Sequence, residues 1–144
     1  MNWVVDTCLV IDVLDHDPEF GDASARLLDR MAPEGIVLCP ISYVELAPAF
    51  LGDLRRQEEF LEGIGIHYAV PWSWTDTRNA HKAWERHVQL YRQRKVSRRP
   101  VADILIGAFA IGRKGLLTRN SEDFRSSFPT LKLLEPKGSE ERKG

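Results

Sequence analysis

Short apolar runs alternate with longer amphipathic segments along most of the chain. The apolar runs are three to four residues long and are bounded by turn or helix-start residues, a pattern typical of buried strands. We predict strands over residues 3–5, 36–39, 67–70, 116–118 and 131–134, with the last at a sheet edge. Helices are predicted over residues 7–14, 22–31, 42–51, 54–62, 75–94 and 101–114.

Helix-capping residues and prolines support these boundaries. Thr7 can cap the first helix, and Asn120 can cap a further turn near the end of the chain. Pro48 is expected to kink the helix that contains it, whereas Pro100 suits the first turn of the next helix. The segment 101–114 is apolar nearly all round, so it should be central and buried.

Strands that alternate with helices favour a parallel sheet between two helical layers. We therefore expect the α/β class, as a three-layer α/β/α sandwich with a short central parallel sheet. We expect a single domain over residues 1–136 and a charged, flexible C-terminal tail over residues 137–144.

Composition fits this class. A chain of 144 residues with 43% hydrophobic and 28% charged residues can form one domain with a substantial core. The net charge of −1 neither requires nor excludes a nucleic-acid partner. No stretch is apolar enough for a membrane span or signal peptide, so the expected location is the cytoplasm. Cys8 and Cys39 are interpreted as buried, reduced thiols.

Four carboxylates lie at or beside predicted helix starts: Asp6, Glu45, Asp103 and Asp123. Asp6 also closes the first strand, and a parallel sheet would direct all these sites to one edge, where α/β proteins bind ligands. Clustered acids repel one another unless a proton or a cation bridges them. Oxygen ligands suit a hard divalent ion, and Mg²⁺ is the first candidate.

Each acid also has a structural interpretation. Ser42 and Glu45 have capping-box spacing, which taken alone favours a cap. Asp103 and Asp123 fall in first turns, where a carboxylate complements the helix dipole. Asp6 is harder to explain in this way, because a buried Asp is rare without a partner or a metal. Asp12 lies on a different helix face and is predicted to be solvated.

A basic stretch precedes Asp103. It contains Arg92, Arg94, Lys95, Arg98 and Arg99, with Arg86 close upstream. Such a stretch is usually a solvated helix end. Beside an acidic crevice it could also hold a phosphate backbone.

Other constellations are weak. The four histidines lack zinc-ligand spacing, and no P-loop, dinucleotide-binding or nucleophile-elbow motif is present. A phospho-acceptor signalling domain would need an Asp after the middle strand and a Lys after a late one. A haloacid-dehalogenase-like phosphatase would need Asp-x-Asp, but the chain has Asp6-Thr7-Cys8.

The chain resembles the PIN-domain family, and more closely the VapC-type toxins of toxin–antitoxin pairs. The matching stretches, in family order, are Val4-Val5-Asp6-Thr7, Ser42-Tyr43-Val44-Glu45-Leu46, Ala102-Asp103-Ile104-Leu105-Ile106-Gly107-Ala108 and Leu117-Thr118-Arg119-Asn120-Ser121-Glu122-Asp123-Phe124. Two positions depart from relatives. Cys8 stands where Ser or Asn is common, and Asn120 stands where some relatives carry Asp.

The resemblance implies a PIN-like fold, Mg²⁺- or Mn²⁺-dependent endoribonuclease activity on RNA, a homodimer and a cognate antitoxin. Asp6, Glu45, Asp103 and Asp123 would form the catalytic, metal-binding set. Thr7, Thr118 and Asn120 would orient carboxylates or water. Arg94, Arg98, Arg99 and Arg119 would contact RNA phosphates. A catalytically silent binding module of the same fold remains the main alternative.

Overall fold

Five short strands form one parallel sheet in the order β3-β2-β1-β4-β5. The structure is a computed structural model that describes residues 2–137. The strands are β1 (Trp3–Val5), β2 (Ile36–Leu38), β3 (Ile66–His67), β4 (Gly115–Leu117) and β5 (Leu133–Leu134). The predicted parallel sheet and the edge position of the last strand are confirmed.

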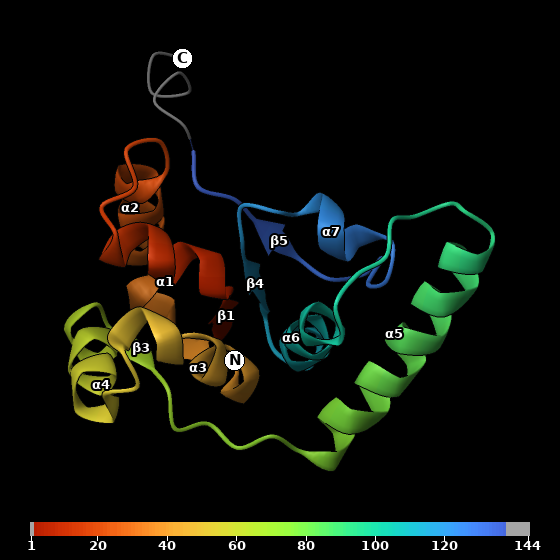
Figure 1. Cartoon of the computed structure of the whole chain (residues 1–144), viewed down its shortest axis with the longest axis horizontal. Helices are drawn as coiled ribbons and strands as arrows, with labels where there is room; N and C mark the ends of the chain where they lie inside the picture. The colour runs from red at the N-terminus through yellow and green to blue at the C-terminus, as the bar shows by residue number, and fades with distance from the viewer. Residues whose placement is uncertain (1, 138–144) are drawn as a thin grey trace.

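Helices cover both faces of this sheet. They are α1 (Thr7–Leu14), α2 (Gly21–Met31), α3 (Pro40–Glu45), α4 (Leu54–Gly63), α5 (Trp74–Arg92), α6 (Val101–Ile111) and α7 (Glu122–Arg125), with 3-10 turns η1 (Ala32–Glu34) and η2 (Ala47–Phe50). In Figure 1, α1, α2 and α4 lie to one side of the strands, and α5, α6 and α7 lie to the other. The expected three-layer arrangement is therefore confirmed.

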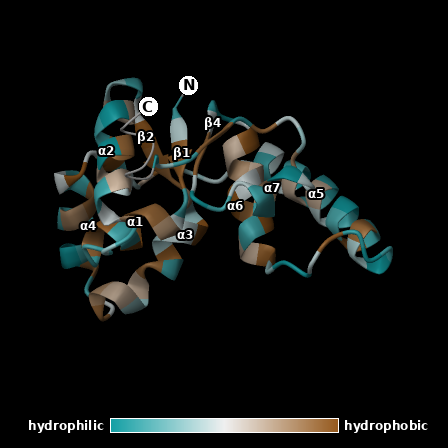
Figure 2. Cartoon of the chain, turned by 90° about the horizontal axis from the view of Figure 1, so that it is seen from above, coloured by the Kyte–Doolittle hydropathy of each residue, from teal (hydrophilic) through white to brown (hydrophobic). Residues whose placement is uncertain are grey.

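Strand periodicity divides the apolar side chains into two cores. In β1, Trp3 and Val5 pack with residues of α1, α2 and α4, whereas Val4 packs with residues of α5 and α6. Val4 is aligned with Val37 of β2 and Leu116 of β4, and these three side chains face the same layer. All are buried, as expected for strands covered on both faces. Figure 2 shows this contrast between hydrophobic strands and the largely hydrophilic α5.

Helix α6 is the central buried helix that its composition predicts, and it packs against β1 and β4. Gly107 permits close packing, because a Cβ there would lie 2.2 Å from the Phe128 ring. Any larger residue would push the C-terminal segment away from α6. Among residues 2–137, no helix has the length and apolar character needed to cross a membrane. Cys8 and Cys39 are free thiols.

Several predicted boundaries were wrong. The helix expected over 42–51 is two elements, because α3 ends at Glu45 and Pro48 lies in the first turn of η2. The third strand is two residues long and starts one residue before the predicted range. Helix α5 starts earlier than predicted, through a capping box between Ser73 and Asp76. Residues 138–144 of the predicted tail lie outside the described residues.

Candidate active site

The sheet changes its direction of winding between β1 and β4. From β1 the chain moves to β2 and β3 on one side, and it later returns to β4 and β5 on the other. Asp6 follows β1 and Thr118 follows β4, so these two residues flank the switch point. The backbone N–H of Asp6 donates to the carbonyl of Leu117 at 2.8 Å, which ties the two strand ends together. Ligands of open α/β sheets bind at this place.

Asp6 is a buried carboxylate held by two side-chain donors. It is 8% exposed, and its Oδ2 accepts from the Thr118 hydroxyl at 2.8 Å and from the Cys8 thiol at 3.5 Å. Burial raises the pKa of Asp6, and the charge of Glu45 adds to this, while the hydrogen bonds oppose it. Burial and the nearby Asp6 also raise the pKa of Cys8 to about 12, which keeps its thiol protonated. Cys8 is therefore a donor and not a nucleophile here.

Glu45 is not the helix cap that its spacing with Ser42 suggests. It lies at the last position of α3, and that helix has no side-chain cap. Instead the hydroxyl of Thr7 donates to Oε1 of Glu45 at 2.8 Å. Thr7 itself was expected to cap α1, but Asp6 occupies the cap position, without a side-chain cap hydrogen bond. Thr7 and Glu45, each of which was predicted to cap a helix, therefore bond to each other and join α1 to α3.

Asp103 lies in the first turn of α6 and is half-buried. Burial, assisted by the charges of Asp6, Asp123 and Glu45 and opposed by that of Arg99, raises the pKa of Asp103 to about 6. These effects place all four acids close enough to interact electrostatically. Like charges with too little compensation favour a proton or a bound cation.

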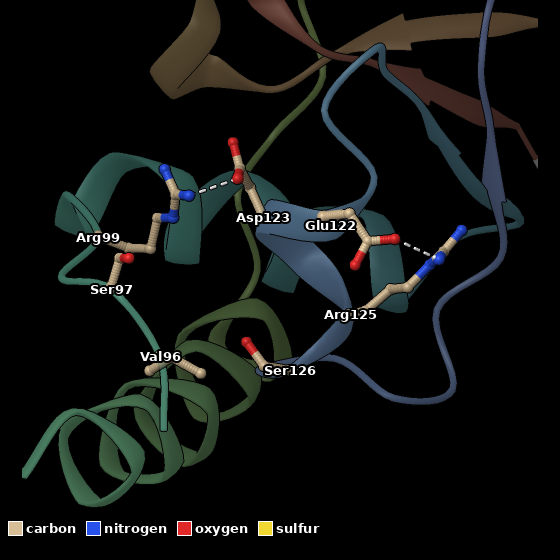
Figure 3. Close-up of a pocket in the computed structure, with 7 residues that line it drawn as sticks. All are labelled: Val96, Ser97, Arg99, Glu122, Asp123, Arg125 and Ser126. Carbon is tan, nitrogen blue, oxygen red and sulfur yellow. Dashed lines mark hydrogen bonds and ion pairs between the residues drawn. The ribbon is translucent and has the colours of Figure 1, made fainter. Parts of the chain in front are cut away.

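Asp123 forms an ion pair within this group. It lies in α7, and its Oδ1 accepts from Nη2 of Arg99, which lies two residues before the start of α6 (Figure 3). Both side chains are partly exposed. The pair faces a cavity of about 450 Å³ that Ser97, Arg125 and Ser126 help to line.

The donor set fits a hard divalent cation. Carboxylate and hydroxyl oxygens are the ligands that Mg²⁺ and Mn²⁺ prefer. Burial is the main cause of the raised pKa values of Asp6 and Asp103, and the neighbouring carboxylates add to it. Within residues 2–137, no three His, Cys, Asp or Glu side chains are gathered tightly enough to hold a metal directly. Three of the carboxylates contact protein groups instead: Glu45 accepts from Thr7, Asp6 accepts from Thr118, and Asp123 pairs with Arg99. Carboxylates that repel one another are drawn together when a cation binds between them.

Thr118 and Asn120 differ in what they contact. Besides its bond to Asp6, Thr118 Oγ1 accepts from the backbone N–H of Asn120 at 3.0 Å, so its hydrogen is directed to the carboxylate. The Asn120 side chain is exposed. The residue that precedes α7 is Ser121, and no side chain caps that helix, so the predicted Asn120 cap was wrong. A role for Asn120 at the metal stays a prediction.

Sequence reasoning missed a buried ion pair behind the site. Asp12, predicted to be solvated, is 2% exposed. It accepts from Nε and Nη2 of Arg119 at 2.9 and 3.2 Å, and from the Ser24 hydroxyl at 3.2 Å. The Arg119 guanidinium also covers the ring of Phe20 at 4.5 Å. These contacts give Arg119 a structural role, and its predicted contact with RNA is untested.

The basic stretch lies in the connection between α5 and α6. Helix α5 ends at Arg92, two residues before the predicted end. Arg94, Lys95 and Arg98 are exposed, whereas Arg99 is half-buried and paired with Asp123. Arg86 donates to the carbonyl of Ser127 at 3.1 Å. The exposed cations therefore lie along the chain that leads to Asp103.

The topology also bears on the phospho-acceptor alternative. The middle strand in space is β1, and Asp6 follows it, so that part of the pattern is present. However, Thr118 follows β4 and Glu135 follows β5, so neither late strand is closed by Lys. Asp6 is also largely shielded from solvent. These observations disfavour a phosphorylated Asp6.

Asp103→Asn is expected to stabilise the metal-free protein above pH 6. The raised pKa means that folded Asp103 keeps its proton between pH 3.8 and about 6, where the unfolded chain releases it. Stability of the wild type therefore falls as pH rises through this window. Thermal melts in EDTA should show a variant that melts roughly 2–5 °C higher at pH 7. Added Mg²⁺ should raise the melting temperature of the wild type more than that of the variant.

A lower melting temperature for Asp103→Asn would contradict this expectation. It would instead assign the carboxylate to the dipole of α6, where loss of the charge destabilises the helix. Asp22→Asn is the matched control, because Asp22 is an exposed acid in the first turn of α2. That variant should melt slightly below the wild type.

Comparison with known proteins identifies the family. The search of curated proteins found no match. One solved structure with a similar fold is described as the crystal structure of VapBC2 from Rickettsia felis bound to a DNA fragment from their promoter. Its TM-score is 0.69 at 18% sequence identity, over 95% of this chain and 100% of that chain. The model of the PIN domain family matches residues 3–126, which include all four carboxylates. The chain therefore belongs to the PIN domain family.

Proposed function

We propose that this protein is a metal-dependent endoribonuclease that hydrolyses RNA phosphodiester bonds as the toxin of a VapBC-type pair. The main support is the electrostatic interaction among four carboxylates at the switch point of the sheet: Asp6, Glu45, Asp103 and Asp123. Nucleases of this family typically depend on Mg²⁺, and the oxygen-rich donor set supports that dependence.

Bound Mg²⁺ or Mn²⁺ would polarise the scissile phosphate and lower the pKa of an attacking water. Asp6 and Asp103 are the residues we assign to hold it most directly, with Glu45 and Asp123 completing the set. Thr118 fixes the orientation of Asp6, and Thr7 fixes that of Glu45. Such hydroxyl partners matter because a metal site needs its carboxylates held in place before the ion arrives.

The exposed part of the basic stretch is proposed to hold the RNA backbone. Arg94 and Arg98 are exposed on the connection that leads into α6, whose first turn contains Asp103. Phosphate contacts of this kind bring affinity without sequence preference. Sequence choice would then come from other surfaces.

Arg94→Gln combined with Arg98→Gln is expected to weaken RNA binding about equally for unrelated sequences. Each lost phosphate contact should flatten the slope of log affinity against log salt by roughly 0.7. Binding can be measured in EDTA with a short unstructured RNA, so that no cleavage occurs. Arg55→Gln combined with Arg56→Gln is the matched control, because these exposed arginines lie on α4. An unchanged slope in the first variant would show that these arginines are only solvated residues of the connection.

We further propose an antitoxin partner and a homodimer. The Rickettsia felis structure of VapBC2 supports a partner of this kind. The surface beside α3 adds support, because Val44, Leu51 and Leu54 are 69%, 87% and 64% exposed. Of these three residues, Leu54 lines a groove of about 550 Å³, together with Tyr43 and Tyr68. Large exposed apolar side chains in one region are typical of protein contact surfaces.

RNA cleavage by the partner-free protein is the direct test. The purified chain should cleave RNA with Mg²⁺ or Mn²⁺ and stop in EDTA. Binding of RNA and metal without cleavage would favour the silent binding module. Absence of both metal binding and cleavage would overturn the proposed function.

A further inference from the structure

The ion pair between Arg99 and Asp123 places a fixed positive charge inside the acidic group. Figure 3 shows the guanidinium of Arg99 directed at the Asp123 carboxylate across the gap between the α5–α6 connection and α7. The side chains of Arg99 and Asp123 are 33% and 26% exposed, so the pair is neither fully buried nor fully exposed. It is therefore stronger than a surface pair and still open to exchange.

Both partners are anchored by their backbones. The N–H of Arg99 donates to Nε2 of the buried His87 on α5, at 3.1 Å. The N–H of Asp123 donates to the carbonyl of Asn120 at 3.0 Å, and the neighbouring Phe124 is in the core. The backbones are thus fixed while the side-chain pair lies at a cavity wall, where the guanidinium has room to move.

Arg99 supplies the charge that a divalent ion would otherwise provide. The charges of the other three acids raise the pKa of Asp103, whereas the charge of Arg99 lowers it. A cation that binds among the carboxylates must either coexist with the guanidinium, against like-charge repulsion, or take Asp123 from it. The second outcome releases Arg99 toward the cavity, which Arg125 also lines.

We propose that Arg99 is an internal competitor of the divalent cation for Asp123. In the metal-free protein it holds Asp123 out of the metal site, and metal binding frees its guanidinium for a phosphate of the RNA. This inference rests on the proposed function, since it takes the four carboxylates as the metal site. It also follows that metal and RNA favour each other's binding, because the same exchange serves both.

The test is titration calorimetry with Mn²⁺ alone, without RNA. Arg99→Gln should tighten Mn²⁺ binding by about three- to tenfold, since Asp123 becomes free to bind the ion. Arg99→Lys keeps the charge with a less specific pairing, so its affinity should lie between those of Arg99→Gln and the wild type. Arg98→Gln removes the same charge from an exposed neighbouring position and should change the affinity by less than about twofold.

A double-mutant cycle with Asp123→Asn separates competition from general charge. In that background Arg99→Gln should lose its effect, because the contested ligand is gone. Equal or weaker Mn²⁺ binding by Arg99→Gln, or the same gain from Arg98→Gln, would overturn the competition. Circular dichroism checks that each variant folds, and Arg99→Lys provides the comparison if the neutral variant does not.

The two proposals fail in different ways. Loss of Mn²⁺ binding in Asp6→Asn, together with RNA cleavage by the wild type, supports the proposed function whatever Arg99 does. Mn²⁺ binding that is identical with and without Arg99 overturns only the competition. Mn²⁺ binding by neither the wild type nor Arg99→Gln overturns both.

Discussion

Asp6→Asn is expected to reduce RNA cleavage at least about 100-fold while the fold is retained. Asp6 is the most buried of the four carboxylates and the one joined to both central strand ends. Asn has nearly the same shape and can still accept from Thr118, so the hydrogen bond at β4 survives. The substitution removes the negative charge that a divalent ion needs. Cleavage of a labelled RNA at saturating Mg²⁺ measures the effect.

Controls make this result specific. Asp103→Asn should give a similar loss, whereas Asp29→Asn, an exposed acid on α2, should cleave like the wild type. Thr118→Val should give a smaller loss, because Asp6 keeps its charge but loses its orienting donor. Equal cleavage by Asp6→Asn and the wild type, or full activity in excess EDTA, would contradict the nuclease proposal.

Arg119→Met is expected to destabilise the protein by about 2–4 kcal/mol. The substitution keeps an apolar stem over Phe20 but leaves Asp12 as a buried charge whose remaining side-chain donor among residues 2–137 is Ser24. A buried carboxylate without its cation costs more than the intact pair contributes. Chemical denaturation with urea, followed by circular dichroism, measures the free energy of unfolding.

An exposed ion pair of the same protein provides the comparison. Arg55→Met breaks the pair with Glu59 on the surface of α4, where both side chains are mostly exposed, and should cost at most about 0.5 kcal/mol. Combining Asp12→Asn with Arg119→Met should recover part of the loss seen for Arg119→Met alone. A loss for Arg119→Met no larger than that for Arg55→Met would show that water reaches Asp12.

The helix and strand pattern was largely predictable because it depends on local periodicity. Short apolar runs such as Val4–Val5 and the uniformly apolar α6 have few alternatives to burial between helical layers. Local signals failed where two elements compete for one side chain. The spacing of Ser42 and Glu45 satisfies the capping-box pattern, yet Glu45 bonds to Thr7, which is 38 positions away. Helix position could not reveal this, because the partner is set by the packing of α1 against α3.

Charge partners were the least predictable feature. Asp12 and Arg119 are 107 positions apart, and Arg99 and Asp123 are 24 positions apart. Local sequence patterns therefore could not predict either ion pair. Asp12 was predicted to be solvated from its helix face alone. A buried charge is stable only through a specific partner, and that partner is brought near by the sheet order.

The sequence by itself determined the class of fold and singled out four carboxylates, since strand and helix starts in a parallel sheet place their ends together. The role of these carboxylates at a metal stays a prediction. Only the tertiary structure decided how those acids are held. Thr118 holds Asp6, Thr7 holds Glu45, and Arg99 holds Asp123, while Asp103 is left with a raised pKa. The physical reason is that periodicity indicates which apolar residues are buried, whereas hydrogen bonds and ion pairs depend on distances between residues remote in the chain.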